Sequence, residues 1–395
     1  MTPISPETRQ FINEHQSDDV RNLALQARKY PDVDIPAAIT QIAGRQIAAE
    51  KIPSWKEIDD IWYPKHLSLE QCSSEITARY KASLLQGESL ADLTGGFGID
   101  CSFLATGFRS ATYVERQAEL CTIAAHNFPA LDLNHISVRN DDGVAYLEAM
   151  SPVDCIFLDP ARRKHGGKPV AISDCEPNVA ELEGLLLSKA NRIMIKLSPM
   201  LDLSQALKEL PHTQEVHIIS VNNECKELLL LLGQTAPEEI PVHCVNLSTK
   251  GEQEKQLFVF TREQEQHSEC SYTDTLGNYL YEPNASLLKA GAFRSIAAAY
   301  SVKKLHPNSH LYTSDTQIEG FPGRTFRIIN RCSLNKKEIK ENLSDLKKAN
   351  ITVRNFPATV AELRKRIKLA EGGDTYLFAS TLNDGQKILI RCGKV

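Results

Sequence analysis

The sequence predicts an α/β protein built around a doubly wound, mostly parallel sheet of about seven strands. Short apolar runs alternate with helical patterns across residues 81–262, which favours such a sheet over a sandwich or a helical bundle. A glycine-rich turn at residues 95–98 directly follows the first of these runs. The chain of 395 residues exceeds one ordinary core, so we also expect an N-terminal helical region and small α+β domains at the C-terminal end.

Residues 1–80 are expected to be helical. Apolar side chains recur at spacings of three and four in 20–27 and 35–52, and prolines separate these stretches. A last helix is expected over residues 69–84, just before the first core strand. Its polar side chains either line the pocket of a ligand or belong to an ordinary amphipathic helix that covers the sheet.

The glycine turn indicates a nucleotide site. Gly95, Gly96 and Gly98 lack the Cβ that would block left-handed turns and close approach of a ligand. Asp92 and Asp100 bracket the turn with negative charge, which suits a cationic ligand better than a pyrophosphate. S-adenosylmethionine, with its sulfonium and ammonium groups, is the expected cofactor. The expected cofactor-binding residues of this turn are Asp92, Thr94, Gly95, Gly96, Phe97 and Gly98.

Acidic residues also follow the next strands. A strand at 110–115 ends in Glu115, a candidate for gripping two ribose hydroxyls, and Asp141 and Asp142 follow a third strand at 136–138. We favour Asp142 over Asp141 for the adenine amino group. A fourth strand at 154–158 leads to Asp159, so all four loops are expected at one edge of a parallel sheet, where ligands bind in such folds.

The core is expected to continue with a helix at 179–189 and a fifth strand at 192–198 that brings Lys196 to the same edge. Further apolar runs supply the remaining strands at 216–221, 228–232, 242–247 and 257–260.

A polar stretch at 262–274 is the predicted linker to the C-terminal part. Helices are expected there at 284–300, 336–349 and 359–369, and strands at 326–329, 351–354, 375–380 and 387–391.

The net charge of −5 hides an asymmetry. From residue 285 onward the chain has 20 Lys and Arg against 9 Asp and Glu, whereas the first 284 residues have 25 against 41. This polarity indicates that the C-terminal part meets a polyanion, although a basic face without a partner is the alternative. In the helix at 359–369 the expected phosphate contacts are Arg364, Lys365, Arg366 and Lys368.

The order of Asp92 to Gly98, Glu115, Asp142 and the Asp159-Pro160 loop resembles the motif series of class I S-adenosylmethionine-dependent methyltransferases, over roughly residues 80–262. The segments 74–81, 158–163 and 281–285 and the basic C-terminal part look like a bacterial methyltransferase family that carries a THUMP-like domain at its end. The resemblance implies a Rossmann-like methyltransferase core with an RNA-binding appendage. In most THUMP enzymes that domain precedes the core, whereas here it follows.

The domains expected from pattern and resemblance together are a helical region at 1–80, a methyltransferase domain at 81–262, a ferredoxin-like α+β domain at 275–325 and a THUMP-like basic domain at 326–395. The expected function is methylation of a base in tRNA or rRNA. Two alternatives stay open: an RNA-binding protein whose core binds the cofactor without turnover, and an oxidoreductase of the NAD type.

The acceptor is expected to meet Asp159, Pro160 and Arg162. Asp159 can accept a hydrogen bond from a target amine, as in amino-methylating enzymes whose loop reads Asp-Pro-Pro-Tyr. This chain departs from that pattern, because Arg162 stands where the aromatic residue would stack on a flipped base, which puts N6-adenine specificity in doubt. Cys175 as the nucleophile of a pyrimidine C5 mechanism is a weaker alternative.

Composition excludes other classes. No apolar stretch nears the roughly 20 residues that span a bilayer. Acidic residues interrupt the first 20 positions, so a secretory signal is not expected. We expect the protein in the cytoplasm. The ten cysteines are widely spaced, which predicts reduced thiols and no metal site.

Overall fold

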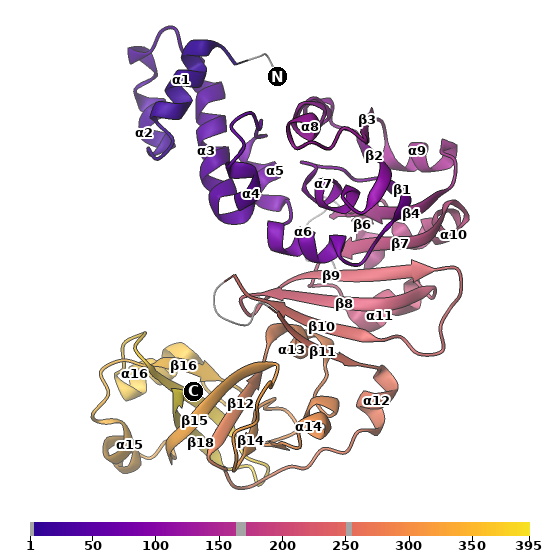
Figure 1. The fold of residues 1–395 in the computed structure, drawn as a ribbon. Helices are drawn as coiled ribbons and strands as arrows, with labels where there is room; N and C mark the ends of the chain where they lie inside the picture. The colour runs from indigo at the N-terminus through magenta and orange to yellow at the C-terminus, as the bar shows by residue number, and fades with distance from the viewer. Residues whose placement is uncertain (1–3, 163–170, 250–254) are drawn as a thin grey trace. The chain divides into compact units, whose positions relative to one another are not determined.

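The computed structural model describes residues 4–162, 171–249 and 255–395, and the chain separates into two compact units (Figure 1). The first unit comprises residues 1–214 with 228–237, and the second comprises 215–227 with 238–395. Of Arg162 only the backbone is described, and Arg163 lies outside the described residues.

The first unit begins with helices, as expected. Their bounds are α1 Pro6–Glu14, α2 Val20–Leu25, a 3-10 turn Ala27–Lys29, α3 Ile35–Lys51, α4 Pro53–Lys56, α5 His66–Gln71 and α6 Glu75–Ala82. The end of this region packs on the glycine turn, where the rings of Trp55 and Phe97 meet edge to face with centroids 5.2 Å apart. The helical region therefore buries one side of the loop that the sequence singles out.

The core alternates strands and helices. Its elements are β1 Gly87–Asp92, α7 Ile99–Ala105, β2 Phe108–Glu115, α8 Ala118–Ala130, β3 Ile136–Asn140, α9 Gly143–Ala149, β4 Val153–Leu158, β5 Ala161–Arg162, a 3-10 turn Ile172–Asp174, β6 Cys175–Glu176, α10 Val179–Lys189, β7 Ala190–Leu197 and α11 Leu203–Glu209. Strand β9 comprises Glu224–Gly233, and from Leu228 onward it belongs to this unit and pairs with β7.

Strand order in this unit is β9-β7-β4-β1-β2-β3, parallel throughout except for β9, which runs antiparallel to β7. The last residue of β1, Asp92, lies opposite Tyr113 on β2 and Phe157 on β4. Parallel strands in this register end together, so the loops that follow β1, β2, β3, β4 and β7 share one edge. This confirms the predicted doubly wound core.

The helix expected over residues 69–84 is two helices. Helix α5 ends at Gln71 and α6 begins at Glu75, and Ser73 lies in the break. The hydroxyl of Ser73 donates to Oδ2 of Asp100 at 2.7 Å. In the break, Ser73 is therefore in contact with a residue of α7.

The second unit holds two groups of strands. Its elements are β8 Thr213–Val221, β10 Val242–Leu247, β11 Lys255–Phe260, α12 Arg262–His267, β12 Tyr279–Pro283, α13 Ala285–Ala290, α14 Ser295–Ala299, β13 Lys303–Lys304, β14 Tyr312–Ser314, β15 Gly323–Cys332, α15 Lys336–Leu343, β16 Asn350–Val353, α16 Val360–Ile367, β17 Thr375–Thr381 and β18 Lys387–Lys394. Strand β10 pairs parallel with β8 and antiparallel with β11. A second sheet has the order β13-β14-β12-β15-β18-β17-β16.

Three stretches differ from the sequence expectation. Part of the polar stretch at 262–274 forms α12, because Thr261 and Gln264 cap it reciprocally. The helix expected at 284–300 breaks at Gly291, whose φ of +78° ends α13, and α14 starts anew at Ser295. The helix expected at 336–349 ends at Leu343.

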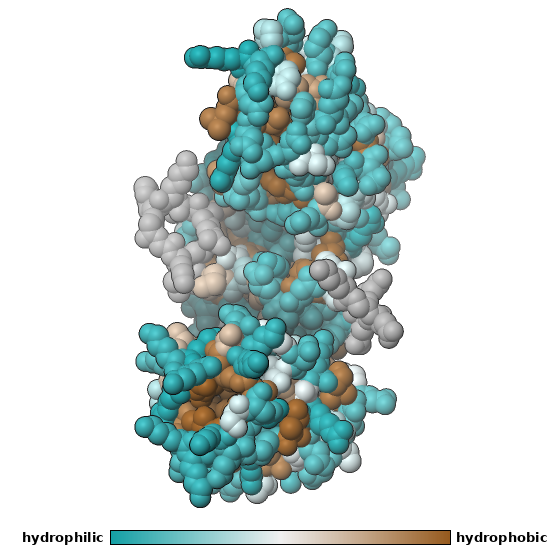
Figure 2. Space-filling model, turned by 90° about the vertical axis from the view of Figure 1, so that its left-hand side faces the viewer, coloured by the Kyte–Doolittle hydropathy of each residue, from teal (hydrophilic) through white to brown (hydrophobic). Residues whose placement is uncertain are grey.

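The surface is largely hydrophilic in the face that Figure 2 shows, with a hydrophobic area gathered in the lower part of the view. No helix of the described residues is long and apolar enough to cross a membrane.

Candidate functional site

The glycine turn is held tightly against β2. The amide of Gly95 donates to the carbonyl of Val114 at 2.9 Å, and a Cβ at Gly95 would lie 2.2 Å from the Tyr113 ring. Gly96 and Gly98 have φ of +54° and +87°, in the left-handed region that favours glycine. Steric conflict at Gly95 and the left-handed φ of the other two favour glycine at all three positions, and Gly98 leads directly into α7.

Glu115 closes the turn from the end of β2. One carboxylate oxygen, Oε2, accepts from the amide of Gly96 at 2.9 Å, and the other accepts from the amide of Gln117 at 2.8 Å. The side chain is nearly buried. The acid that the sequence placed about 20 residues after the glycines is thus in direct contact with them.

Asp92 lies at the end of β1 and is 1% exposed. Its Oδ1 accepts from the amide of Thr94 at 3.0 Å, while its buried Oδ2 has no hydrogen-bond partner among the described residues. Burial raises the pKa of this carboxyl well above its ordinary value. The bond from Thr94 opposes the shift, and three nearby carboxylates add to it. An unsatisfied buried acceptor in a negative environment suits a cationic ligand.

Asp159 follows β4 and faces the same edge. Its amide donates to Oγ1 of Thr94 at 2.6 Å, and its Oδ2 lies 2.6 Å from Nζ of Lys196. Burial raises the pKa of Asp159, and the Lys196 ammonium opposes that shift. Pro160 is buried behind it, and Arg162 continues the chain in β5.

A buried charged network at this edge joins Lys81, Lys196 and Asp100, and the partly exposed Asp159 extends it through Lys196. Nζ of Lys81, which is fully buried, lies 3.1 Å from Oδ1 of Asp100, and Nζ of Lys196 lies 3.3 Å from Oδ2 of the same residue. Both lysines also donate to the Ser73 hydroxyl at 3.0 Å. Burial alone would raise the pKa of Asp100, but the two ammonium groups outweigh it and lower that pKa to about 2.

The acids after β3 differ from each other in role. Oδ1 of Asp142 accepts from the amides of Val144 and Ala145 and so caps α9, and Asp141 accepts from the amide of Asp142. Both side chains are exposed. The amide of Asp141 donates to the carbonyl of Glu115 at 3.2 Å, which keeps this loop beside the end of β2.

The basic residues of α16 are unequal. The guanidinium of Arg364 donates to the carbonyl of Ala349 at 3.2 Å, and that of Arg366 donates to the carbonyl of Leu334 at 2.8 Å. Arg364 is only 20% exposed, whereas Lys365 and Lys368 are exposed. The two arginines therefore help to stabilise the C-terminal domain. Among the described contacts, no side-chain bond from Lys365 or Lys368 to a backbone carbonyl is seen.

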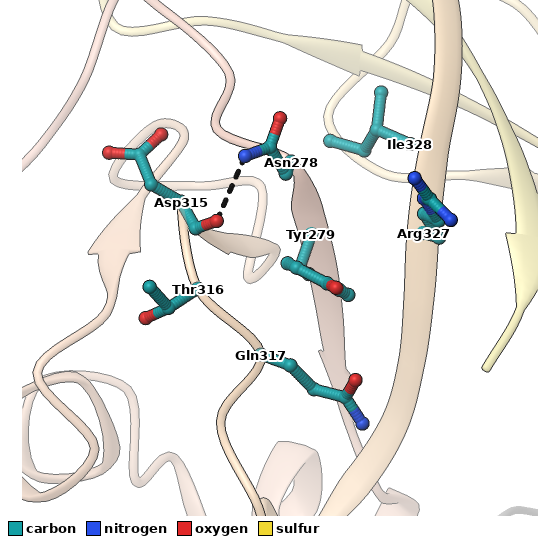
Figure 3. Close-up of a pocket in the computed structure, with 7 residues that line it drawn as sticks. All are labelled: Asn278, Tyr279, Asp315, Thr316, Gln317, Arg327 and Ile328. Carbon is teal, nitrogen blue, oxygen red and sulfur yellow. Dashed lines mark hydrogen bonds between the residues drawn. The ribbon is translucent and has the colours of Figure 1, made fainter.

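A shallow pocket of about 490 Å³ lies on the second sheet (Figure 3). Tyr279 on β12 and Arg327 on β15 are directly opposite in the antiparallel pairing and line it together. On its other side Nδ2 of Asn278 donates to the carbonyl of Asp315 at 2.9 Å. An aromatic ring beside a guanidinium is a combination that can contact a nucleotide.

Sequence reasoning missed the part that Lys81 takes in the site, whereas Ser73 is one of the polar side chains of residues 69–84 that it considered for the pocket. On α6 the buried positions are Thr77, Ala78 and Lys81, so the lysine occupies the apolar face of the helix. A lysine on the buried stripe of an amphipathic helix is the signal that could have identified it, because such a cation needs a buried partner. Cys175, considered as a nucleophile, is 3% exposed in β6.

Comparisons with known proteins match this architecture. A model described as a ferredoxin-like domain matches residues 279–322, and one described as THUMP domain-like matches residues 323–394. The crystal structure of a "putative methyltransferase" from Porphyromonas gingivalis W83 is 36% identical, with a TM-score of 0.87, and the match covers 98% of this chain and 97% of that one.

Two proteins of Mycobacterium tuberculosis, from strains CDC 1551 and H37Rv, are each named as an uncharacterized S-adenosylmethionine-dependent methyltransferase. Each is 22% identical over 310 residues, which is 78% of this chain and 81% of the relative. The fold, the edge of acidic loops and the full-length likeness agree, and the chain belongs to the family of class I S-adenosylmethionine-dependent methyltransferases that end in a ferredoxin-like and a THUMP-like domain.

Proposed function

We propose that this protein transfers the methyl group of S-adenosylmethionine to a base of tRNA or rRNA in the cytoplasm. The observation that carries the cofactor half of the proposal is Asp92, whose buried Oδ2 lacks a partner beside the glycine turn. A cation placed there would satisfy the carboxylate and offset the charge of the surrounding acids.

The remaining cofactor roles follow from the shared edge of the sheet. Glu115 uses one lone pair of each oxygen on a backbone amide, so both oxygens keep capacity to accept from ribose hydroxyls. Oδ2 of Asp142 is not used by the α9 cap and can accept from an adenine amino group, with Asp141 as the alternative. The cofactor would lie against the backbone of the turn, and the residues assigned to it there are Thr94, Gly95, Gly96, Phe97 and Gly98.

For the acceptor we assign Asp159, Pro160 and Arg162. The cofactor supplies an electrophilic methyl group, and the protein has mainly to align the acceptor in line with it. Lys196 and Thr94 fix Asp159 from two sides, so its carboxylate is oriented before an acceptor arrives. A hydrogen bond from a target amine to this carboxylate would point the nitrogen lone pair away from Asp159.

The C-terminal module is the proposed RNA-binding part. Its excess of positive charge supports this, and the exposed Lys365 and Lys368, together with Arg364 and Arg366, are the phosphate contacts we assign on α16. Tyr279 and Arg327 add a place where a single nucleotide can stack or bind by its phosphate. As domains we propose residues 1–80, 81–262, 275–325 and 326–395.

The test combines binding with transfer. Purified protein is titrated with S-adenosylhomocysteine by calorimetry and is then given radiolabelled S-adenosylmethionine with tRNA and rRNA from a strain that lacks the gene. Binding together with label on one RNA class is the expected result. Binding without label on either RNA would favour an RNA-binding protein with an inactive core, and absence of binding would overturn the cofactor assignment.

A further inference from the structure

Two histidines and a glutamate gather on the parallel pair β8 and β10 of the second unit. His243 lies directly opposite His217 in the register, and Glu215 is two residues before His217 on the same strand. Residues i and i+2 of a strand face the same side of a sheet, so the pairing places all three side chains on one face. None of the roles proposed above uses them.

The contact geometry of the three side chains is close. Nε2 of His217 lies 3.3 Å from Oε2 of Glu215, and Nε2 of His243 lies 3.9 Å from the same oxygen. The two imidazole rings are stacked, with centroids 4.3 Å apart and an angle of 12° between their planes. One potential ligand atom from each residue lies within 4.8 Å of the other two.

These distances approach those of a tetrahedral zinc ion. Zinc binds imidazole nitrogen and carboxylate oxygen at about 2.0–2.1 Å, so tetrahedral ligand atoms lie about 3.4 Å apart. The observed 3.3 Å and 3.9 Å lie near that value, and one of the two stacked imidazole rings must also rotate so that both nitrogen lone pairs point at the same ion. We propose that Glu215, His217 and His243 form a binding site for Zn²⁺ that joins β8 to β10.

Burial strengthens the case for these ligands. His217 is 2% exposed, while the side chains of His243 and Glu215 are 23% and 34% exposed. The site is thus closed on the side of His217 and open on the other, where a water molecule can be the fourth ligand. Two histidines, one glutamate and a water are a recurrent zinc ligand set.

The wide spacing of the cysteines predicts no metal site. The histidines of this site are far apart in the sequence and come together only because β10 pairs with β8 in parallel. A search for paired cysteines or for closely spaced histidines does not detect such a set.

The proposal is tested with Zn²⁺ alone on full-length protein freed of metal by a chelator. Competition against a chromophoric chelator should give one tightly bound ion per chain. Glu215→Gln keeps the size of the side chain and removes its charge, and His243→Gln removes one ligand at a partly exposed position. Each should weaken Zn²⁺ binding by about 100-fold, which is of the size seen when the environment of a metal site is damaged, whereas His66→Ala at an exposed position of α5 should bind as the wild type does.

Cobalt distinguishes this site from adventitious binding by thiols. Co²⁺ in the proposed site should give visible d–d bands without a thiolate charge-transfer band. Cys225 is a partly exposed thiol of the second unit, so a Cys225→Ser variant should give the same spectrum. A thiolate band, binding that survives both Glu215→Gln and His243→Gln, or absence of tight Zn²⁺ binding to the wild type would each overturn the proposal.

Discussion

The ammonium nitrogen of Lys196 lies 2.6 Å from Oδ2 of Asp159, and this ion pair ties the end of β7 to the loop after β4. The same ammonium lies 3.3 Å from Asp100. One lysine therefore neutralises two acids at the edge of the sheet where the cofactor is proposed to bind. The ion pair with Lys196 fixes the loop after β4, which we assign to the acceptor.

Replacement of Lys196 by Met should destabilise the fold by about 2 kcal/mol, because it leaves buried carboxylates with less compensation. The loss stays below the usual cost of breaking a buried pair, since Lys81 still neutralises Asp100 and Asp159 is 36% exposed to water. Urea denaturation measures it. Lys208→Met on the exposed side of α11 is the control and should change stability by less than about 0.5 kcal/mol.

Asp100 should contribute to acid denaturation in a defined window. Its pKa is lowered to about 2 from an ordinary value of 3.8, so the ionised carboxylate stabilises the folded state at neutral pH. That contribution is complete above the unfolded-state value and is lost as the pH falls toward about 2. The free energy of unfolding should therefore fall less steeply between pH 4 and pH 2 in Asp100→Asn than in the wild type. Above pH 5 the two slopes should coincide, and a difference that persists there would contradict the assignment.

Asp92→Asn should separate stability from cofactor binding. The raised pKa of Asp92 means that its ionised form costs stability at neutral pH, so the neutral amide should leave the fold as stable or make it more stable. Affinity for S-adenosylmethionine should fall at least 10-fold, or about 1.4 kcal/mol. Calorimetry and urea denaturation measure the two effects. Unchanged affinity would remove Asp92 from the cofactor site, and a loss of stability as large as that expected for Lys196→Met would contradict the stability cost assigned to its ionised form.

The raised pKa of Asp92 also predicts a pH dependence of binding. The free protein holds a proton on Asp92 up to a higher pH than an ordinary aspartate does, whereas a bound cation favours the carboxylate. Binding of S-adenosylmethionine should therefore release protons and strengthen as the pH rises. Calorimetry in buffers of different ionisation enthalpy detects the released protons, and S-adenosylhomocysteine, which lacks the sulfonium charge, should release fewer. Equal proton release with both ligands would argue against contact with the sulfonium.

Gly95→Ala should damage the turn through steric conflict. The new Cβ would lie 2.2 Å from the Tyr113 ring, so either the ring or the loop must move, at a cost of about 1–3 kcal/mol. Gly184→Ala in α10 is a matched control, because nothing lies within 4 Å of its added Cβ and alanine favours a helix by up to about 1 kcal/mol. Thermal unfolding should move in opposite directions in the two variants. Cofactor affinity should fall only in Gly95→Ala.

Exchange of both Lys365 and Lys368 for Gln should weaken RNA binding without harm to the fold. The slope of log K against log salt should decrease by about 1–2, because two phosphate contacts are lost. Arg364→Gln tests the structural role of Arg364. Because this variant loses the bond to the Ala349 carbonyl, it should lower both RNA affinity and the stability of the fold. Filter binding at several salt concentrations with melting curves distinguishes the two classes. An unchanged slope in the lysine variant would move the RNA surface away from α16.

Contacts between distant residues accompany two of the differences between the sequence prediction and the structure. Residues 69–84 have the pattern of one helix. In the structure Ser73 lies outside both helices and donates to Asp100, and Lys81 on the buried face of α6 pairs with the same carboxylate. The polar stretch at 262–274 has the composition of a linker, yet Glu265 accepts from the amides of Phe293, Arg294 and Ser295 and so anchors the start of α14. At Ser73 a contact between distant residues outweighs the local preference of the chain, whereas α12 starts on a local cap and the bonds of Glu265 add the long-range contact.

The amino-acid sequence was enough to predict the alternation of strands and helices, the glycine turn and the acids at or just after the ends of β1, β2 and β3, because periodicity and turn chemistry act over a few neighbouring residues. It also determined the excess of positive charge in the C-terminal part. Three relationships appear only in the folded molecule: Lys81 and Lys196 share Asp100, one oxygen of Asp92 is left unsatisfied, and His217 meets His243. These relationships depend on strand register and on burial, which arise when segments far apart in the chain pack together and leave water.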